Sequence, residues 1–268
     1  MFPIVNVNGK LVDKSTPVFS LDHAAVHRGE VIQEKIRFFN GRFLFQEKHY
    51  FHLMANMRMA RMDIPISFTP DFFYSEIVKL QSESGLENAV VYFNVSQNFD
   101  QTDFWVTAAA LPENWHFNSL FQIDQYRETH MPSGFHHRIH FTIPQERILM
   151  KFAQENDLND LILLNESKSI ARSIYGNFFV IHGNKIATPK LENGAKDDVL
   201  RTVTLAAASH APYFDTVIEE EIFPFSLVKA DEIFIARDGF GIISVSNFKK
   251  QNYSTEITSQ LIDFVEEL

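Results

Sequence analysis

The dipeptide Asn-Gly occurs twice near the start of the chain, each time between two runs with the composition of β-strands. Asn8-Gly9 stands inside IVNVNGKLVD, and Asn40-Gly41 stands inside IRFFNGRFLF. A two-residue turn between antiparallel strands requires positive φ angles at both positions, which asparagine and glycine tolerate best. We therefore expect two β-hairpins to open the chain, within a fold that contains antiparallel sheet.

Apolar spacing and turn residues divide the rest of the chain into helices and strands. Thr69 followed by Pro70 is typical of a helix N-cap and first position, and Gly85 suits the end of that helix. The other expected helices cover residues 47–62, 144–156 and 197–210, with a last one capped at Ser254 or Thr255. Expected strands cover residues 88–96, 103–111, 117–127, 161–165, 231–236 and 240–246, and a further hairpin covers 178–189.

A chain of 268 residues is long for one small core, because domains commonly run to ~100–200 residues. The polar run PENWHFN, residues 112–118, is the best candidate linker. We expect an N-terminal α/β domain of residues 1–112, a linker of residues 113–117 and a C-terminal α/β domain of residues 118–268. Each should be of α+β type, with a mainly antiparallel sheet and flanking helices, around a cleft.

The charge balance disfavours two classes of partner. A net charge of −10 argues against nucleic acid and against an anionic membrane surface, since both select for basic proteins. The chain has no cysteine, which removes disulfides and thiolate chemistry. The start MFPIVNVNGKLVD does not read as a secretory signal, and no 18-residue apolar run occurs. We expect a cytoplasmic protein.

Histidines are the residues most suggestive of a metal. The string HMPSGFHHRIH contains His130, His136, His137 and His140. On a strand, His136 and His140 would share a face with Arg138 between them, and no carboxylate partner is evident, so we predict no metal site. The sequence also shows no Ser-His-Asp order, Walker loop or dinucleotide fingerprint.

Several strings together resemble one family. RGEVIQEKIRFFNG resembles Y-G-D-G-x-F-E-T-x-R-x-x-x-G, and EKHYFHLMANMRMARMDIP resembles E-x-H-x-x-R-L-x-x-S-A-x-x-L. LILLNESKSIARSIYGNFF, ENGAKDDVLRTVTLA and LVKADEIFIARDGFGIISV have counterparts in the same order. These patterns are those of the fold-type IV pyridoxal-phosphate enzymes, which include branched-chain and D-amino-acid aminotransferases and 4-amino-4-deoxychorismate lyase. The resemblance implies a two-domain D-amino-acid aminotransferase-like fold, a pyridoxal phosphate cofactor and a homodimer.

The chain departs from this family at the residues that carry its chemistry. The Schiff-base lysine position falls on Arg138, Ile139 or His140, and none of these can form the Schiff base. The resemblance places the glutamate at the cofactor's ring nitrogen on Arg172, where a guanidinium would disfavour the ring proton. The phosphate-binding residues fall on His52, on Asp198-Val199-Leu200 and on Ala236-Arg237, while the arginine that follows the second of these groups is kept as Arg201.

These departures predict that pyridoxal phosphate is not covalently bound and that catalysis has been lost. The resulting hypothesis is a pseudoenzyme that binds a small anionic ligand or a partner protein. The alternative is an active aminotransferase or lyase that uses another lysine, and a third hypothesis is metal-assisted chemistry by the histidines. Arg172 should face an anion or an acidic side chain such as Asp198. The candidate ligand-binding residues of the vacated cofactor site are Arg28, His52, His140, Arg172, Asn177, Asp198, Arg201, Ala236 and Arg237.

Overall fold

The computed structural model describes residues 2–111, 121–129 and 144–266. Their contacts divide the chain into two compact units, an N-terminal unit of residues 2–111 and a C-terminal unit of residues 121–129 and 144–266. The predicted linker lies outside the described residues, so the domain boundary stays a prediction.

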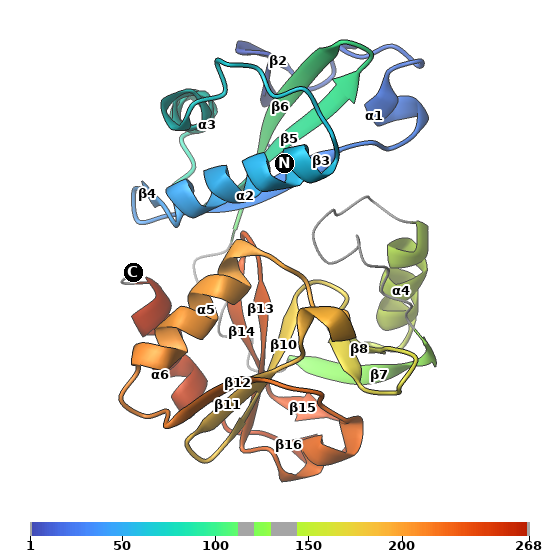
Figure 1. Ribbon diagram of the computed structural model, residues 1–268, viewed down its shortest axis with the longest axis vertical. Helices are drawn as coiled ribbons and strands as arrows, with labels where there is room; N and C mark the ends of the chain where they lie inside the picture. Colours follow the sequence, from blue (N-terminus) through green and yellow to red (C-terminus); the bar gives the residue numbers. More distant parts are fainter. Residues whose placement is uncertain (1, 112–120, 130–143, 267–268) are drawn as a thin grey trace. The chain divides into compact units, whose positions relative to one another are not determined.

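The N-terminal unit is a six-stranded sheet covered on one face by two helices (Figure 1). Its elements are β1 (Ile4–Val7), β2 (Lys10–Asp13), α1 (Ala24–His27), β3 (Ile32–Phe39), β4 (Arg42–Phe43), α2 (Gln46–Met59), α3 (Pro70–Ser84), β5 (Ala89–Asn98) and β6 (Gln101–Ala110). The strands pair antiparallel in the order β2-β1-β6-β5-β3-β4. Leu53 and Met57 of α2 and Ile77 and Leu80 of α3 pack on the sheet to form the core.

Both Asn-Gly predictions are confirmed. Asn8 and Gly9 have φ angles of 49° and 83°, and Asn40 and Gly41 have φ angles of 50° and 76°. The α3 prediction also holds, because the Thr69 side chain accepts the amide of Phe72 and Gly85 ends the helix in the left-handed region. The short helix α1, capped by the His23 side chain, was not predicted.

The C-terminal unit contains two five-stranded sheets. Its elements are β7 (Gln122–Thr129), α4 (Pro144–Glu155), β8 (Asp160–Leu164), β9 (Ile170–Ser173), β10 (Asn177–His182), β11 (Lys185–Thr188), the 3-10 helix η2 (Leu191–Asn193), α5 (Val199–His210), β12 (Thr216–Glu219), the 3-10 helix η3 (Pro224–Lys229), β13 (Glu232–Arg237), β14 (Gly241–Val245), β15 (Asn247–Phe248), β16 (Gln251–Asn252) and α6 (Glu256–Glu266). The strand orders are β12-β11-β10-β13-β14 and β16-β15-β7-β8-β9. Our expectation of one sheet per domain was therefore wrong here. The pairings are mostly antiparallel, as predicted, and β7–β8, β7–β15 and β11–β12 are the parallel pairs.

The two sheets pack against each other and carry helices on their outer faces. Ile162 and Leu164 of β8 share a core with Phe178 and Val180 of β10, while Leu161 and Leu163 face α4 in a second cluster. A strand covered on both faces needs apolar residues at every position, which explains the unbroken run Leu-Ile-Leu-Leu. Helices α5 and α6 lie against the other sheet, as Figure 1 shows. The start of β8 lies beside the end of β9, because Asp160 accepts the amide of Ile174, and Gly176 lies against Ala236 of β13.

Gly176 is required by the approach of two strands. A Cβ atom built on it would lie 2.3 Å from the carbonyl oxygen of Ala236 on β13. We expect Gly176→Ala to destabilise the protein by at least ~2 kcal/mol, because backbone must move to relieve the overlap. Urea unfolding would measure this loss in the free energy of unfolding. Gly183→Ala is the control: Gly183 has φ of 53° but no neighbour within 4 Å, so its cost should be about 1 kcal/mol. Equal effects of the two changes would contradict this account.

Candidate functional site

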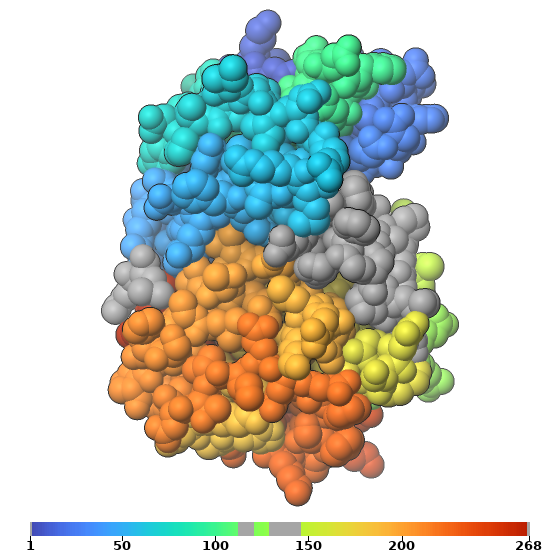
Figure 2. Space-filling model, in the orientation of Figure 1, coloured from blue at the N-terminus to red at the C-terminus, as the bar shows by residue number. Residues whose placement is uncertain are grey.

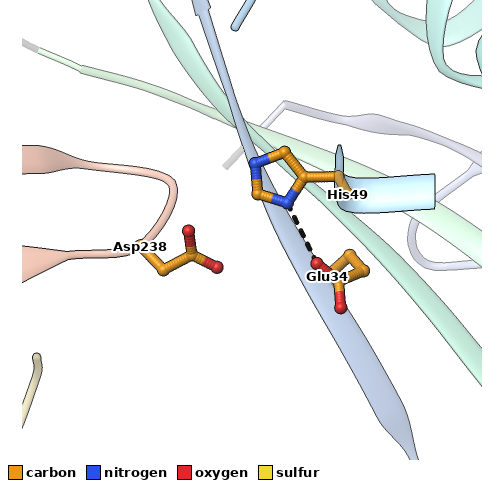
Figure 3. Close-up of side chains that lie close together, drawn as sticks. All are labelled: Glu34, His49 and Asp238. Carbon is orange, nitrogen blue, oxygen red and sulfur yellow. Dashed lines mark hydrogen bonds and ion pairs between the residues drawn. The ribbon is translucent and has the colours of Figure 1, made fainter. Parts of the chain in front are cut away.

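In the N-terminal unit, one buried carboxylate holds two imidazoles. Glu34 of β3 is 1% exposed, and its two oxygens accept from His49 Nδ1 at 3.0 Å and His52 Nδ1 at 2.5 Å. Figure 3 shows the first of these bonds; it also labels Asp238, which belongs to the C-terminal unit and is described below. Burial would raise the pKa of Glu34, but the charge interaction with His52 and the two hydrogen bonds outweigh it, so the pKa is lowered. His52 is therefore oriented by Glu34.

Arg28, the other candidate of this unit, is a surface residue. Its guanidinium forms a two-pronged ion pair with Glu30, with Nε at 2.5 Å and Nη2 at 3.1 Å from the carboxylate oxygens. Its side chain is 56% exposed. This pair is local and solvated, and exposed pairs of this kind contribute little to stability.

In the C-terminal unit, the protein's own carboxylates occupy the start of α5. Asp198 is the N-cap of this helix, and its Oδ1 accepts the amide of Arg201 at 2.8 Å. Its Oδ2 accepts Asn177 Nδ2 at 2.9 Å. Asp238 Oδ1 accepts the amide of Leu200 at 3.3 Å. Two of the amides with which a helix N-terminus would bind an external anion are thus already used.

The neighbouring candidates also have partners within this unit. Asn177 is fully buried, and its Oδ1 accepts the amide of Lys196 at 2.8 Å. Arg201 donates from Nη2 to the Pro189 carbonyl at 3.0 Å and to Glu219 Oε2 at 2.9 Å. Ala236 is buried in β13, where it pairs with Asn177. Asn177, Asp198 and Arg201 therefore tie β10 and β12 to α5.

Arg172 is buried in β9, with 7% of its surface exposed. Its Nη1 donates to the carbonyl oxygens of Ser173 at 3.1 Å and Ile174 at 2.9 Å. The acid in contact with it is Glu146 of α4, whose Oε1 lies 4.0 Å from Nη2. We expected an anion or an acidic side chain such as Asp198, and the acid found there is Glu146. Burial lowers the pKa of Arg172, and the charges of Glu146 and Asp160 oppose that effect. Asp198 is turned instead toward its own helix.

Asp160, which the sequence reasoning missed, lies at the centre of this region. Its Oδ1 accepts the amides of Leu161 at 2.7 Å and Ile174 at 2.9 Å, while its buried Oδ2 has no hydrogen-bond partner among the described residues. Burial raises the pKa of Asp160 to about 6, against the hydrogen bonds and the nearby charge of Arg237. The available signal was an acid at the first position of an otherwise apolar strand.

Arg237 completes the group at the end of β13. Its guanidinium carbon lies 3.7 Å from the ring centre of Phe240 and 4.5 Å from that of Tyr175, which is a cation–π arrangement. Burial and the charge of Asp160 raise the pKa of Tyr175, and Arg237 lowers it. We call Arg172, Arg237, Asp160 and Glu146 the arginine cluster; it holds two guanidinium groups and two carboxyl groups.

The remaining candidates lie outside the described residues. These are Arg138, Ile139 and His140, the positions to which the resemblance assigns the Schiff-base lysine, together with the other histidines of the same string. Among the lysines that the structure describes, Lys196 alone is buried, at 8% exposure, directly before α5. Lys151, the lysine nearest in sequence to residues 138–140, is 62% exposed and pairs with Glu155 at 3.7 Å.

Comparison with known proteins defines first the fold and then the family. A branched-chain aminotransferase of Thermoproteus uzoniensis, solved with norvaline, superposes with a TM-score of 0.86 at 16% identity over 100% of this chain and 94% of that one. A provisionally assigned 4-amino-4-deoxychorismate lyase of Legionella pneumophila gives a TM-score of 0.83 at 17% identity, over 95% of this chain and 96% of that one. At such identities the likeness shows the fold, which is that of the fold-type IV enzymes.

The family follows from the sequence match. The model of the amino-transferase class IV family matches residues 32–248, and the chain belongs to this family. A protein of Thermotoga maritima named "Probable branched-chain-amino-acid aminotransferase" is 26% identical over 102 residues, which cover 37% of this chain and 36% of that protein. The family is pyridoxal-phosphate-dependent.

The residues at the start of α5 do not fit the phosphate of that cofactor. A phosphate would have to displace the carboxylates of Asp198 and Asp238 from the amides of Arg201 and Leu200, or approach them as a like charge. Arg172 likewise does not fit the position that the resemblance assigns to it, beside the ring nitrogen of the cofactor. The protonated ring is a cation, and a guanidinium next to it would repel that proton.

A membrane-crossing role finds no support in the helices: within residues 2–111, 121–129 and 144–266, each is too short or too polar to span a bilayer.

Proposed function

We propose that this class IV aminotransferase-like protein has lost pyridoxal-phosphate catalysis and binds a small anion at the arginine cluster of its C-terminal unit. The single observation that carries the loss of catalysis is the use of the Leu200 and Arg201 amides by the carboxylates of Asp238 and Asp198. The absence of lysine at positions 138–140 supports it, since a Schiff base requires a primary amine.

The arginine cluster supports the anion-binding half of the proposal. Arg237 is half-buried, and two aromatic rings fix the plane of its guanidinium. Arg172 is held by two carbonyl oxygens through Nη1, and its Nη2 lies beyond hydrogen-bond range of Glu146. Two oriented guanidinium groups suit a carboxylate or an inorganic oxyanion.

The loss of catalysis is tested by adding pyridoxal phosphate to the purified protein. We expect no yellow absorbance band and no lysine adduct after borohydride reduction, as read by peptide mass mapping. Asp198→Gly combined with Asp238→Asn is the informative variant, because it frees the α5 amides and should weakly restore binding of inorganic phosphate. A reduced adduct on Lys196 in the unmodified protein would overturn the proposal and support an active transferase or lyase that uses that lysine.

The family resemblance also supports two further proposals about the whole protein. We propose that it is a homodimer and that it resides in the cytoplasm. Sedimentation velocity tests the first, and a sedimentation coefficient of a 31.0 kDa monomer at micromolar concentration would contradict it.

A further inference from the structure

We propose that a cleft between α2 and α3 of the N-terminal unit binds the protonated amino group of an alkylamine, which is either a free amine or the lysine side chain of another protein. The cleft belongs to a different structural unit from the arginine cluster. It goes beyond the proposed function, because it takes a cation where the arginine cluster takes an anion.

The cleft is formed by the first turns of the two helices. Its volume is about 250 Å³. Both helices lie at the surface of the N-terminal unit, in light blue to cyan in Figure 2. The lining residues that carry the argument are Glu47 and Tyr50 of α2 and Asp71, Phe73 and Tyr74 of α3. Pockets that enclose drug-sized ligands measure roughly 300–1,000 Å³, so this cleft suits a group the size of one side chain rather than a bulky cofactor.

Three aromatic side chains of the lining are held in place by contacts of their own. The Tyr50 hydroxyl donates to the carbonyl oxygen of Phe68 at 2.8 Å, and its ring centre lies 5.9 Å from that of Phe73. Tyr74 packs edge-to-face with Phe43, with ring centres 6.0 Å apart. Aromatic rings attract cations at their faces and also cover apolar chain. The lining therefore suits an organic cation better than a hydrated metal ion.

The charges of the lining have one sign. Glu47 and Asp71 stand in the first turns of α2 and α3, and no lysine, arginine or histidine is among the described residues that line the cleft. Neither carboxylate has a side-chain hydrogen bond or ion pair with another residue of the described part of the chain. Each helix N-terminus is equivalent to about half a positive charge, so a net negative charge remains to attract a cation.

A protonated amino group on an apolar chain uses both features of the lining. Its three N–H groups can donate to the carboxylates of Glu47 and Asp71, while its carbon chain lies against the aromatic rings. Both carboxylates are exposed, and exposed charge pairs and cation–π contacts each contribute little. We therefore expect a dissociation constant on the order of 1 mM for a simple alkylamine, from these same contributions.

Pentylammonium is the probe, and 1-pentanol is its uncharged counterpart of the same chain length. Two-dimensional NMR of the ¹⁵N-labelled full chain at pH 7 should show saturable shifts of the amides of residues 46–50 and 71–74 with pentylammonium. We expect 1-pentanol to bind about tenfold more weakly, because it lacks the charge. Tyr74→Leu, which keeps an apolar side chain at a partly exposed position, should weaken pentylammonium binding about threefold.

The charge contribution is tested by a pair of double variants. Glu47→Gln combined with Asp71→Asn should weaken pentylammonium binding about tenfold. Glu83→Gln combined with Glu87→Gln is the matched control, because it removes two charges at exposed positions toward the other end of α3, and it should leave the affinity unchanged. Equal binding of pentylammonium and 1-pentanol, or equal affinity in the two double variants, would overturn the inference.

A blocked tripeptide, acetyl-Gly-Lys-Gly-amide, distinguishes the two sources of the amino group. Tighter binding of the peptide than of pentylammonium at the same amides would support a lysine side chain of another protein as the occupant. Weaker binding would support a free amine. None of these measurements depends on the arginine cluster, so this inference and the proposed function can fail separately.

Discussion

Replacing Arg172 with alanine is expected to destabilise the protein by about 3 kcal/mol at pH 7.5. The change removes the buried cation beside Asp160 and the donor to the carbonyl oxygens of Ser173 and Ile174, and an uncompensated buried charge costs roughly this much. Urea unfolding gives the free energy directly. Arg147→Ala, on the exposed face of α4, is the control and should change stability by less than about 0.5 kcal/mol.

The pH dependence of this loss identifies the partner. Because the pKa of Asp160 in the folded protein is about 6, above its ordinary 3.8, the acid becomes ionised only as the pH rises through 6. A neutral Asp160 needs no cation, so the cost of Arg172→Ala should be smaller at pH 5.0 than at pH 7.5. In the Asp160→Asn background the cost should be reduced at both pH values. A loss that is equal in all four conditions would mean that Arg172 acts through its carbonyl contacts alone.

Glu34→Ala is expected to cost at least about 3 kcal/mol. It removes a fully buried carboxylate together with the hydrogen bonds that it accepts from His49 and His52. Since the pKa of Glu34 is lowered in the folded protein, its contribution is complete above its ordinary value of 4.5 and is lost as the pH falls through the folded value. The difference between protein and variant should therefore hold at pH 7 and shrink at strongly acidic pH.

Gln33→Ala is the matched control for Glu34→Ala. It lies on the same strand with its side chain on the opposite face, where it bonds to Asn94 at 2.7 Å. Its loss should cost about 1 kcal/mol, with no dependence on pH. If both variants unfold at the same urea concentration, the Glu34 network does not stabilise the fold as described.

Local signals in the sequence were sufficient for most elements of the fold. Asn-Gly turns and the Thr69-Pro70 start act over a few residues, so their structural consequence is fixed by the residues themselves. The number of sheets in the C-terminal unit was not predictable in the same way. Whether β7 pairs with β8 or joins the sheet of β10 depends on contacts between distant segments, and alternation along a strand does not specify its neighbours.

In the candidate site, too, local signals could be read from the sequence and contacts between distant segments could not. The resemblance identified Arg172 as a substituted residue, and we expected an anion or an acidic side chain such as Asp198 beside it. The acid beside it is Glu146, not Asp198. Asp198 carries the signal of a helix N-cap, an aspartate three residues before the amide it accepts, and this local bond to Arg201 takes precedence over a distant cation. Asp160 was missed because an acid beside an apolar strand usually lies at a solvated strand end.

The self-capped start of α5 has a consequence for the protein in the cell. Enzymes that leave helix amides open for a cofactor gain stability when the cofactor binds, so their folded population follows its supply. Here Asp198 and Asp238 satisfy the amides of Arg201 and Leu200 within the chain itself. The abundance of this protein should therefore be indifferent to vitamin B6 starvation, a nutritional stress under which cofactor-dependent relatives lose their stabilising ligand.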